Sequence, residues 1–399
     1  MSQSVLEPTL PVRRSVLSAL RRGFPEGSES DPNALLVSDA EWLAACDPPT
    51  VIAKPADVPR PTEDLRDYVS IGTYWWPNPD TPDGLPYVHR DGEFSPQITK
   101  YDRPRWDLHS EGLVRMHLAA GLVDHHRYTD AIERWLDVWY VNPDTAMNPH
   151  LRHAQMCPGL DKGRAVGCID FNVRGAHFVD ALDDILDAYP AVAPGVRDWW
   201  SRMFRWLTEP ELRSWHEAMP NNIGVHYDGT IARLAMFVGD DATADRVLEE
   251  ALWRRVDPQI DPAGKMPEEL RRTRSFSYTL MNLAGFLDLA CLADARGRDL
   301  FDAKSESGRS IASAVDWVWT LAAGVGDWPC EQIGGVHWDS LVRLWWCIPA
   351  DHRKRYPLPD LAHRLDPDLV ADPRRVMPDL LMHPFHQPVW REYVGCFDT

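Results

Sequence analysis

Five stretches of the chain gather amide, imidazole, phenol and guanidinium side chains beside aromatic residues. They are residues 72–93, 147–169, 221–228, 268–278 and 328–333. Amide and guanidinium groups donate hydrogen bonds to a carboxylate, and His or Tyr side chains can transfer protons. These residue types therefore indicate acid–base chemistry on an acidic molecule.

Motifs of several other site types are missing from the sequence. No phosphate loop of the GxGxxG or GxxxxGK[ST] type occurs, and neither a GxSxG nucleophile turn nor an HExxH zinc motif is present. The HLRH run at 150–153 has the spacing of a metal-binding pair, but no carboxylate or Cys completes it at the usual distance along the chain. We therefore expect neither a metal nor a cofactor.

The elements that carry these stretches have a helical period. Apolar residues recur at i, i+3, i+4, i+7 and i+8, which predicts helices with one face in a core. The sets are Ile132, Trp135, Leu136, Trp139 and Tyr140; Phe178, Leu182, Ile185, Leu186 and Tyr189; Ala244, Val247, Leu248, Ala251 and Leu252; and Leu283, Phe286, Leu287, Ala290 and Cys291. Strand-like alternation is scarce, so we predict an all-α protein.

The predicted helices come in pairs. The segments 117–123 and 128–139 are separated by a break near Asp124, and the segments 230–240 and 241–256 by a Gly–Asp turn. Such αα-hairpins can curl into a ring when they follow one another. Between them run long Pro-rich loops, of which residues 68–104 form the longest.

The boundaries follow from where prolines cluster. We expect residues 1–65 to be an extended segment, with a short basic helix at 16–22, because five prolines punctuate residues 48–61. Residues 66–345 would form the helical domain. Residues 346–399 are again rich in proline and would pack over it as a tail.

Composition limits the partners and the compartment. The net charge of −18 argues against nucleic acid and anionic membranes, and a polyanion would need a local basic cleft. The seven Cys form no CxxC pair, which favours free thiols. The first 25 residues hold no apolar run typical of a secretion signal, and no 18-residue apolar stretch occurs, so we expect a cytoplasmic protein without a membrane span.

The order and spacing of four motifs resemble those of the alginate lyase superfamily over about residues 65–335. The motifs are IGTYWWPNPDTPDGLPYVHRDGEF, NNIGVHYD, PEELRRTRSFSYTLMNL and DWPCEQI, and MNPHLRHAQMCPGLDKGRAVGCID resembles the segment after the first. The resemblance implies an α/α toroid of helical hairpins with a cleft across one face. It also implies β-elimination on a uronate-containing poly- or oligosaccharide.

That reaction needs a neutralised carboxylate, a base for the adjacent C–H, and an acid for the leaving oxygen. By carry-over from the family, Asn222 hydrogen-bonds the carboxylate with Asn221 beside it, and Arg272 supplies positive charge. Tyr278 acts as base, acid or both. Because an unperturbed Tyr has a pKa of about 10, it needs a nearby cation, which Arg272 or Arg274 can provide.

The sequence departs from the family pattern at Ile223, where the family has a catalytic His. His226 lies three residues further on, and in a helix it would share a face with position 223. We therefore include His226 among the catalytic candidates. The substrate-binding candidates are Trp75, Trp76, His153, Gln155, Asn221, Tyr227 and Arg274.

Structural roles are open for the same residues. Asn221 and Asn222 follow a proline and fit a turn with an N-cap, and His226 and Tyr278 fit packed positions on amphipathic helices. Arg272 and Arg274 fit a solvated face. Trp75 and Trp76 fit either a sugar-stacking platform or a core.

Three functions remain open on this basis. The first is a lyase for uronate saccharides. The second is a cytoplasmic small-molecule enzyme of secondary metabolism on the same toroid, which eliminates an anionic group or closes a ring on an acidic metabolite. The third is a non-catalytic binding protein, because a lost catalytic residue is what such a protein would show.

Overall fold

The structure, a computed structural model, describes residues 32–55, 58–166, 168–324 and 326–373. The predicted basic helix at 16–22 and the last part of the predicted tail, 374–399, lie outside these residues. The described chain forms two compact units, which we call the N-terminal unit (34–213) and the C-terminal unit (214–373). The predicted boundaries at residues 65 and 345 fall inside these units and stay predictions.

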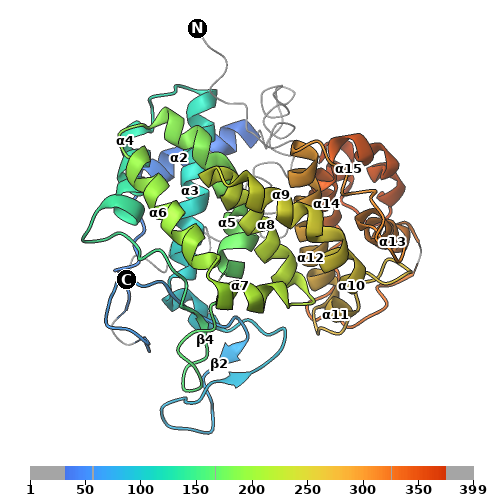
Figure 1. Ribbon diagram of the computed structural model, residues 1–399, viewed down its shortest axis with the longest axis horizontal. Coiled ribbons are helices and arrows are strands. Elements are labelled where there is room, and N and C mark those ends of the chain that lie inside the picture. The colour runs from blue at the N-terminus through green and yellow to red at the C-terminus, as the bar shows by residue number, and fades with distance from the viewer. Residues whose placement is uncertain (1–31, 56–57, 167, 325, 374–399) are drawn as a thin grey trace. The chain divides into compact units, whose positions relative to one another are not determined.

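The N-terminal unit is built on α3 and α5, which pack along each other (Figure 1). Its other elements are further helices, short strands and turns. The elements are α2 (Pro32–Ala45), β1 (Val69–Ile71), β2 (Trp75–Trp76), β3 (Val88–His89), η1 (Pro96–Lys100), α3 (Arg103–Leu122), α4 (Thr129–Leu136), η2 (Asp137–Val141), β4 (His153–Met156), α5 (Cys168–Ala188) and α6 (Ala193–Leu207).

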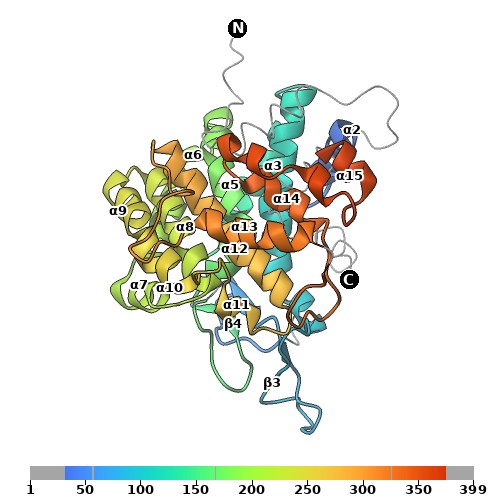
Figure 2. The same cartoon turned by 90° about the vertical axis from the view of Figure 1, so that its right-hand side faces the viewer.

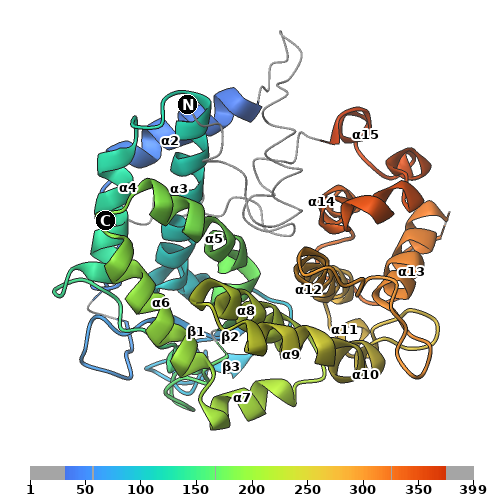
Figure 3. The ribbon, with the colours of Figure 1, turned by 45° about the horizontal axis from the view of Figure 1, so that its top comes forward.

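The C-terminal unit is built on α8 and α12, with α9, α13 and α14 packed around them (Figures 2 and 3). The chain enters it through α7 (Pro210–Glu217), which crosses the division. Its elements are α8 (Asn222–Val238), α9 (Asp241–Ala251), η3 (Leu252–Val256), α10 (Asp257–Gln259), α11 (Pro267–Leu270), α12 (Ser275–Ala295), α13 (Ile311–Ala323), α14 (Ser340–Cys347), η4 (Ala350–Arg355), η5 (Leu358–Leu361) and α15 (Pro367–Ala371).

Both predicted hairpins are confirmed. In the second, α8 ends at Gly239, whose φ of 79° is the left-handed conformation that favours glycine. The next residue, Asp240, accepts a hydrogen bond from the backbone N–H of Thr243 and so caps α9. The first hairpin joins α3 to α4, and the four apolar stripes are buried except for the half-buried Leu252.

The expectation of an extended segment over residues 1–65 is wrong for 32–45, which form α2. Pro32 stands at the first helical position, where its missing N–H costs nothing, and the other prolines follow after the helix ends. Leu36, Ala40 and Leu43 repeat at a helical period and are fully buried. Tertiary packing of this face stabilises the helix.

The helix α12 is the most apolar long helix of the described chain. Among the described helices, α12 alone is long and apolar enough to cross a membrane. However, 78% of its most apolar 18-residue stretch is buried inside the protein. A core helix passes the same test, so this is weak support for a span. Its Asp288 forms an ion pair with Arg233 of α8, which ties the two central helices together.

Candidate active site

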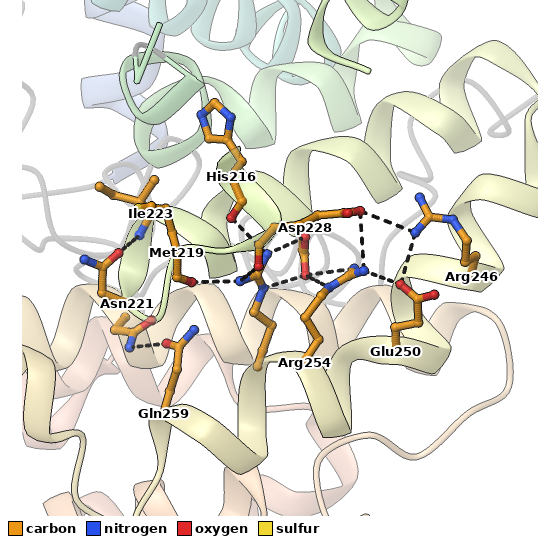
Figure 4. A network of polar contacts seen from close by, with 12 residues as sticks. His216, Met219, Asn221, Ile223, Asp228, Arg246, Glu250, Arg254 and Gln259 are labelled. Atoms are coloured by element: carbon orange, nitrogen blue, oxygen red, sulfur yellow. Dashed lines mark hydrogen bonds and ion pairs between the residues drawn. The ribbon is translucent and has the colours of Figure 1, made fainter. Parts of the chain in front are cut away.

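The first residues of α8 carry two of the predicted site residues. Asn221 is the N-cap, and its side-chain oxygen accepts a hydrogen bond from the backbone N–H of Ile223 at 3.1 Å (Figure 4). The backbone N–H of Asn222 donates to Glu269 Oε1 at 2.8 Å, and its side-chain Nδ2 lies 3.1 and 2.9 Å from the two oxygens of the same carboxyl. Asn222 is therefore hydrogen-bonded to α11, whereas Asn221 caps the start of α8.

The cap role of Asn221 gives a testable expectation. Asn221→Ala should lower the free energy of unfolding by about 1 kcal/mol, because an orphan N–H loses its acceptor. Asn221→Ser should restore most of that loss, since a hydroxyl also caps. Chemical denaturation measures both, and a substrate-binding role would instead appear as a raised KM in both variants.

Glu269 was not among the predicted site residues. Burial raises the pKa of its carboxyl to about 7, against the hydrogen bonds from Asn222 and the charge of Arg272, which lower it. A buried carboxyl with such a pKa beside a predicted catalytic amide is a functional-site feature.

Arg272 and Tyr278 meet at the start of α12. Arg272 Nη2 donates to the Tyr278 hydroxyl at 3.0 Å, and its guanidinium carbon lies 3.9 Å from the centre of the phenol ring. Because α12 begins at Ser275, Arg272 lies in the turn before the helix and folds back over its first turn. The six-residue spacing thus brings a cation onto the phenol.

The segment 328–333 clamps this helix start. Gln332 Oε1 accepts from the backbone N–H groups of Phe276 and Ser277, at 2.9 and 3.3 Å, and replaces the missing N-cap side chain. Trp328 Nε1 donates to Ser275 Oγ at 2.7 Å. The late motif therefore fixes the backbone on which Tyr278 stands.

An ion network lies under the start of α8 (Figure 4). The buried guanidinium of Arg255 donates to both oxygens of Asp228 and to the backbone carbonyls of His216, Glu217 and Met219. A Cβ on Gly224 would stand 2.3 Å from Arg255 Nη1. Only glycine lets the guanidinium reach the loop that presents Asn221 and Asn222.

The geometry does not favour His226 as a replacement for the missing imidazole. His226 is buried between α8 and α12, and its Nε2 donates to the Met281 carbonyl at 3.1 Å. A Cβ on Gly285 would stand 3.3 Å from its Nδ1. Burial lowers the pKa of His226 to about 4, so the ring is neutral and packed.

Tyr227 and Arg274 also have structural surroundings. Tyr227 is buried and stacks on His216, with ring centres 4.5 Å apart. Arg274 pairs through its backbone with Gln332. A substrate-binding role for either residue stays a prediction.

The other predicted binding residues belong to the N-terminal unit. There β2 pairs with β3, and Trp75 packs on a cluster of buried apolar residues around Ile71 and Met156, which favours a core role. Trp76 Nε1 donates to the Glu93 carbonyl at 3.0 Å, and Arg90 covers the ring at 4.8 Å. The stacking platform stays a prediction.

His153 and Gln155 stand on β4, which pairs with β1. His153 Nδ1 lies 2.8 Å from the Lys162 carbonyl, and its Nε2 lies 3.6 Å from an oxygen of Asp67. Gln155 Nε2 donates to the fully buried Asp170 at 3.0 Å. Both side chains tie this loop together, and their substrate contacts stay predictions.

One group in the described residues has the spacing of a metal site. It consists of Asp299, Asp302 and His352, whose ligand atoms lie within 4.8 Å of one another. Arg355 donates to both oxygens of Asp302, at 2.6 and 2.9 Å. The cluster is therefore satisfied as an ion pair, and we assign no metal to it.

The sequence model of the alginate lyase family matches residues 53–328, which is well over half of the chain. The chain belongs to the alginate lyase family. An alginate lyase from Bacteroides ovatus is 28% identical, with a TM-score of 0.75 over 94% of this chain and 95% of that one. Alginate lyase A1-III from Sphingomonas species A1 is 16% identical over 93% and 94%, and its TM-score of 0.52 supports the fold alone. A comparison with curated proteins gives no match.

Membership in the alginate lyase family confirms the predicted α/α toroid fold class. It also confirms a carbon–oxygen lyase of the polysaccharide-lyase type, which acts by β-elimination. The roles of individual residues are not tested by these comparisons. In the C-terminal unit, four groups stand in one connected set: Asn222, Glu269, Arg272 and Tyr278.

Proposed function

We propose that this alginate lyase family member eliminates across the C–O bond of a uronate residue in an acidic poly- or oligosaccharide. The contact between Arg272 and Tyr278 is the observation that carries the proposal. A guanidinium that donates to the phenol oxygen at 3.0 Å favours the ionised form of the phenol, which is the form that accepts a proton.

In this mechanism Asn222 donates a hydrogen bond to the uronate carboxylate and makes the adjacent C–H more acidic. The Tyr278 phenolate takes that proton, and the C–H electron pair forms the new C=C bond. The C–O bond to the neighbouring sugar breaks, and the Tyr278 hydroxyl returns its proton to the departing oxygen. One side chain thus serves as base and then as acid.

Ile223 is compatible with this scheme because Tyr278 performs both proton transfers. The imidazole that the family has at this position is not needed for either step. The surroundings of His226 support the same assignment, since its ring nitrogens face α12.

The test is an assay of the purified protein on alginate, polyglucuronate and their short oligomers. The unsaturated uronate product absorbs ultraviolet light, so elimination appears as a rise in absorbance. A rise on a uronate saccharide is the expected result. A flat trace on all of them would count against this substrate class.

Ile223 also favours a second candidate, an elimination or ring closure on a small acidic metabolite at the same site. The donors for a carboxylate and a departing anion are kept, and the His is replaced by a bulky apolar group. A cytoplasmic setting stays a prediction and agrees with either substrate. Product analysis by mass spectrometry with small carboxylic acids separates the two candidates.

A further inference from the structure

Glu269 contacts Asn222 through its carboxyl and the Arg272 turn through its backbone carbonyl. It accepts the backbone N–H and the side-chain Nδ2 of Asn222, at distances of 2.8 to 3.1 Å. The Glu269 carbonyl accepts from the Arg272 backbone N–H at 3.2 Å. Glu269 is 1% exposed, so its carboxyl is buried against Asn222.

The contacts fit the ionised carboxyl. Oε1 accepts from the backbone N–H and the side-chain Nδ2 of Asn222, and Oε2 accepts from the same Nδ2. A carboxyl hydrogen on either oxygen would therefore face a donor. The first turn of α8 also favours a negative charge there. A protonated carboxyl would instead let the Asn222 amide turn over, so that Oδ1 accepts the carboxyl hydrogen.

We propose that Glu269 is a positioning residue for the β-elimination, and that its carboxylate fixes the Asn222 amide so that one N–H stays directed at the substrate. The proposal rests on the proposed function, in which Asn222 binds the uronate carboxylate. An amide nitrogen has two N–H groups. One Nδ2 hydrogen shared between the two Glu269 oxygens leaves the other Nδ2 hydrogen for the substrate oxygen.

The protonation state of Glu269 then controls whether the Asn222 amide is held in place. Burial is the largest influence on its pKa and raises it to about 7, the Arg272 charge lowers it, and the Glu268 charge raises it. Above this pKa the carboxylate holds Asn222, and below it the amide is released. Activity should therefore rise as the pH passes through about 7.

Stability should change in the opposite direction. The folded pKa lies above the usual 4.5, so this group stabilises the fold below pH 4.5, and the contribution is lost as the pH rises through about 7. A neutral glutamine at this position does not titrate, so the Glu269→Gln variant would not lose this stability as the pH rises. The carboxylate form is thus kept at a cost in stability, as expected for a group with a role in the site.

The decisive variants are Glu269→Gln and, as a matched control, Glu268→Gln. Glu268 is the neighbouring exposed residue, and its carboxyl pairs with Arg271. Glu269→Gln should lower kcat about tenfold to a hundredfold with little change in KM. It should also remove the rise in activity near neutral pH. Glu268→Gln should keep the wild-type kcat and the pH-dependent rise in activity, which should move only to a lower pH because the Glu268 charge that raises the Glu269 pKa is removed. A Glu269→Gln enzyme with a wild-type kcat and a wild-type rise near neutral pH would overturn the proposal.

Melting temperatures test the same contact without activity. Between pH 5 and pH 8 the wild type should lose more thermal stability than Glu269→Gln does. Asn222→Ala combined with Glu269→Gln should shift the melting temperature by less than the sum of the single shifts. Additive shifts in melting temperature, together with the same pH dependence of melting in the wild type and in Glu269→Gln, would overturn the pairing of Glu269 with Asn222. A wild type without elimination activity but with this coupling would instead refute the proposed function and leave the contact established.

Discussion

Tyr278→Phe should lower kcat/KM by about 10³- to 10⁴-fold, because the variant loses the group that removes the proton and the group that returns it. The phenylalanine keeps the ring under the Arg272 guanidinium, which lies 3.9 Å from the ring centre. The cation–π contact and the packing of α12 therefore remain. The melting temperature should stay close to that of the wild type, so the loss of kcat/KM would come from the missing hydroxyl and not from unfolding. Ultraviolet absorbance of the unsaturated product measures the loss of activity.

A matched control is Tyr356→Phe in the same unit. The Tyr356 hydroxyl donates to Asp316 at 2.8 Å, and Tyr356 has no place in the proposed mechanism. Its loss should lower stability and leave kcat/KM unchanged. If Tyr278→Phe kept more than about a tenth of the activity, a base other than Tyr278 would have to be found.

The start of α12 shows how far spacing alone predicts a site. A six-residue separation does not place Arg272 and Tyr278 on one helix face, yet the pair can meet if the helix begins between them. It begins at Ser275, and the two side chains make a hydrogen bond. The two residues could be named from the sequence because the family motif marked them.

Glu269 shows where sequence reasoning stops. Glu268 and Glu269 are adjacent and chemically identical, and α11 is a helix of only four residues, Pro267–Leu270. Which carboxyl is buried depends on how α11 meets α8, and this is a tertiary contact with no local pattern. The same holds for His226, whose surroundings are set by Gly285 of α12.

The elements themselves were predicted where the apolar period was long. The stripes of α4, α5, α9 and α12 are nearly all buried, because a 3.6-residue period leaves one face to pack. The helix α2 was missed because prolines on both sides suggested an extended chain. Proline restricts the residues at and before it, and the run of residues 33–47 between Pro32 and Pro48 was free to form a helix.

Asp228→Ala should lower the free energy of unfolding by about 3 to 5 kcal/mol, because it leaves the buried Arg255 guanidinium without its carboxylate. Arg255 donates to both Asp228 oxygens, and Arg254 lies 3.1 Å from one of them. Denaturant unfolding measures the change. Asp241→Ala is the control, since its side chain is 71% exposed beside Arg296 and its loss should cost less than about 1 kcal/mol.

The same substitution should also reach the site. Arg255 binds carbonyls at the end of α7 and in the loop before α8, and without Asp228 only these neutral acceptors hold its guanidinium opposite Gly224. The loop that presents Asn222 would then move, so a folded Asp228→Ala enzyme should lose activity as well as stability. An Asp228→Ala protein with wild-type kcat/KM would mean that Glu269 alone is enough to hold Asn222 in place, because it is the other support of that residue.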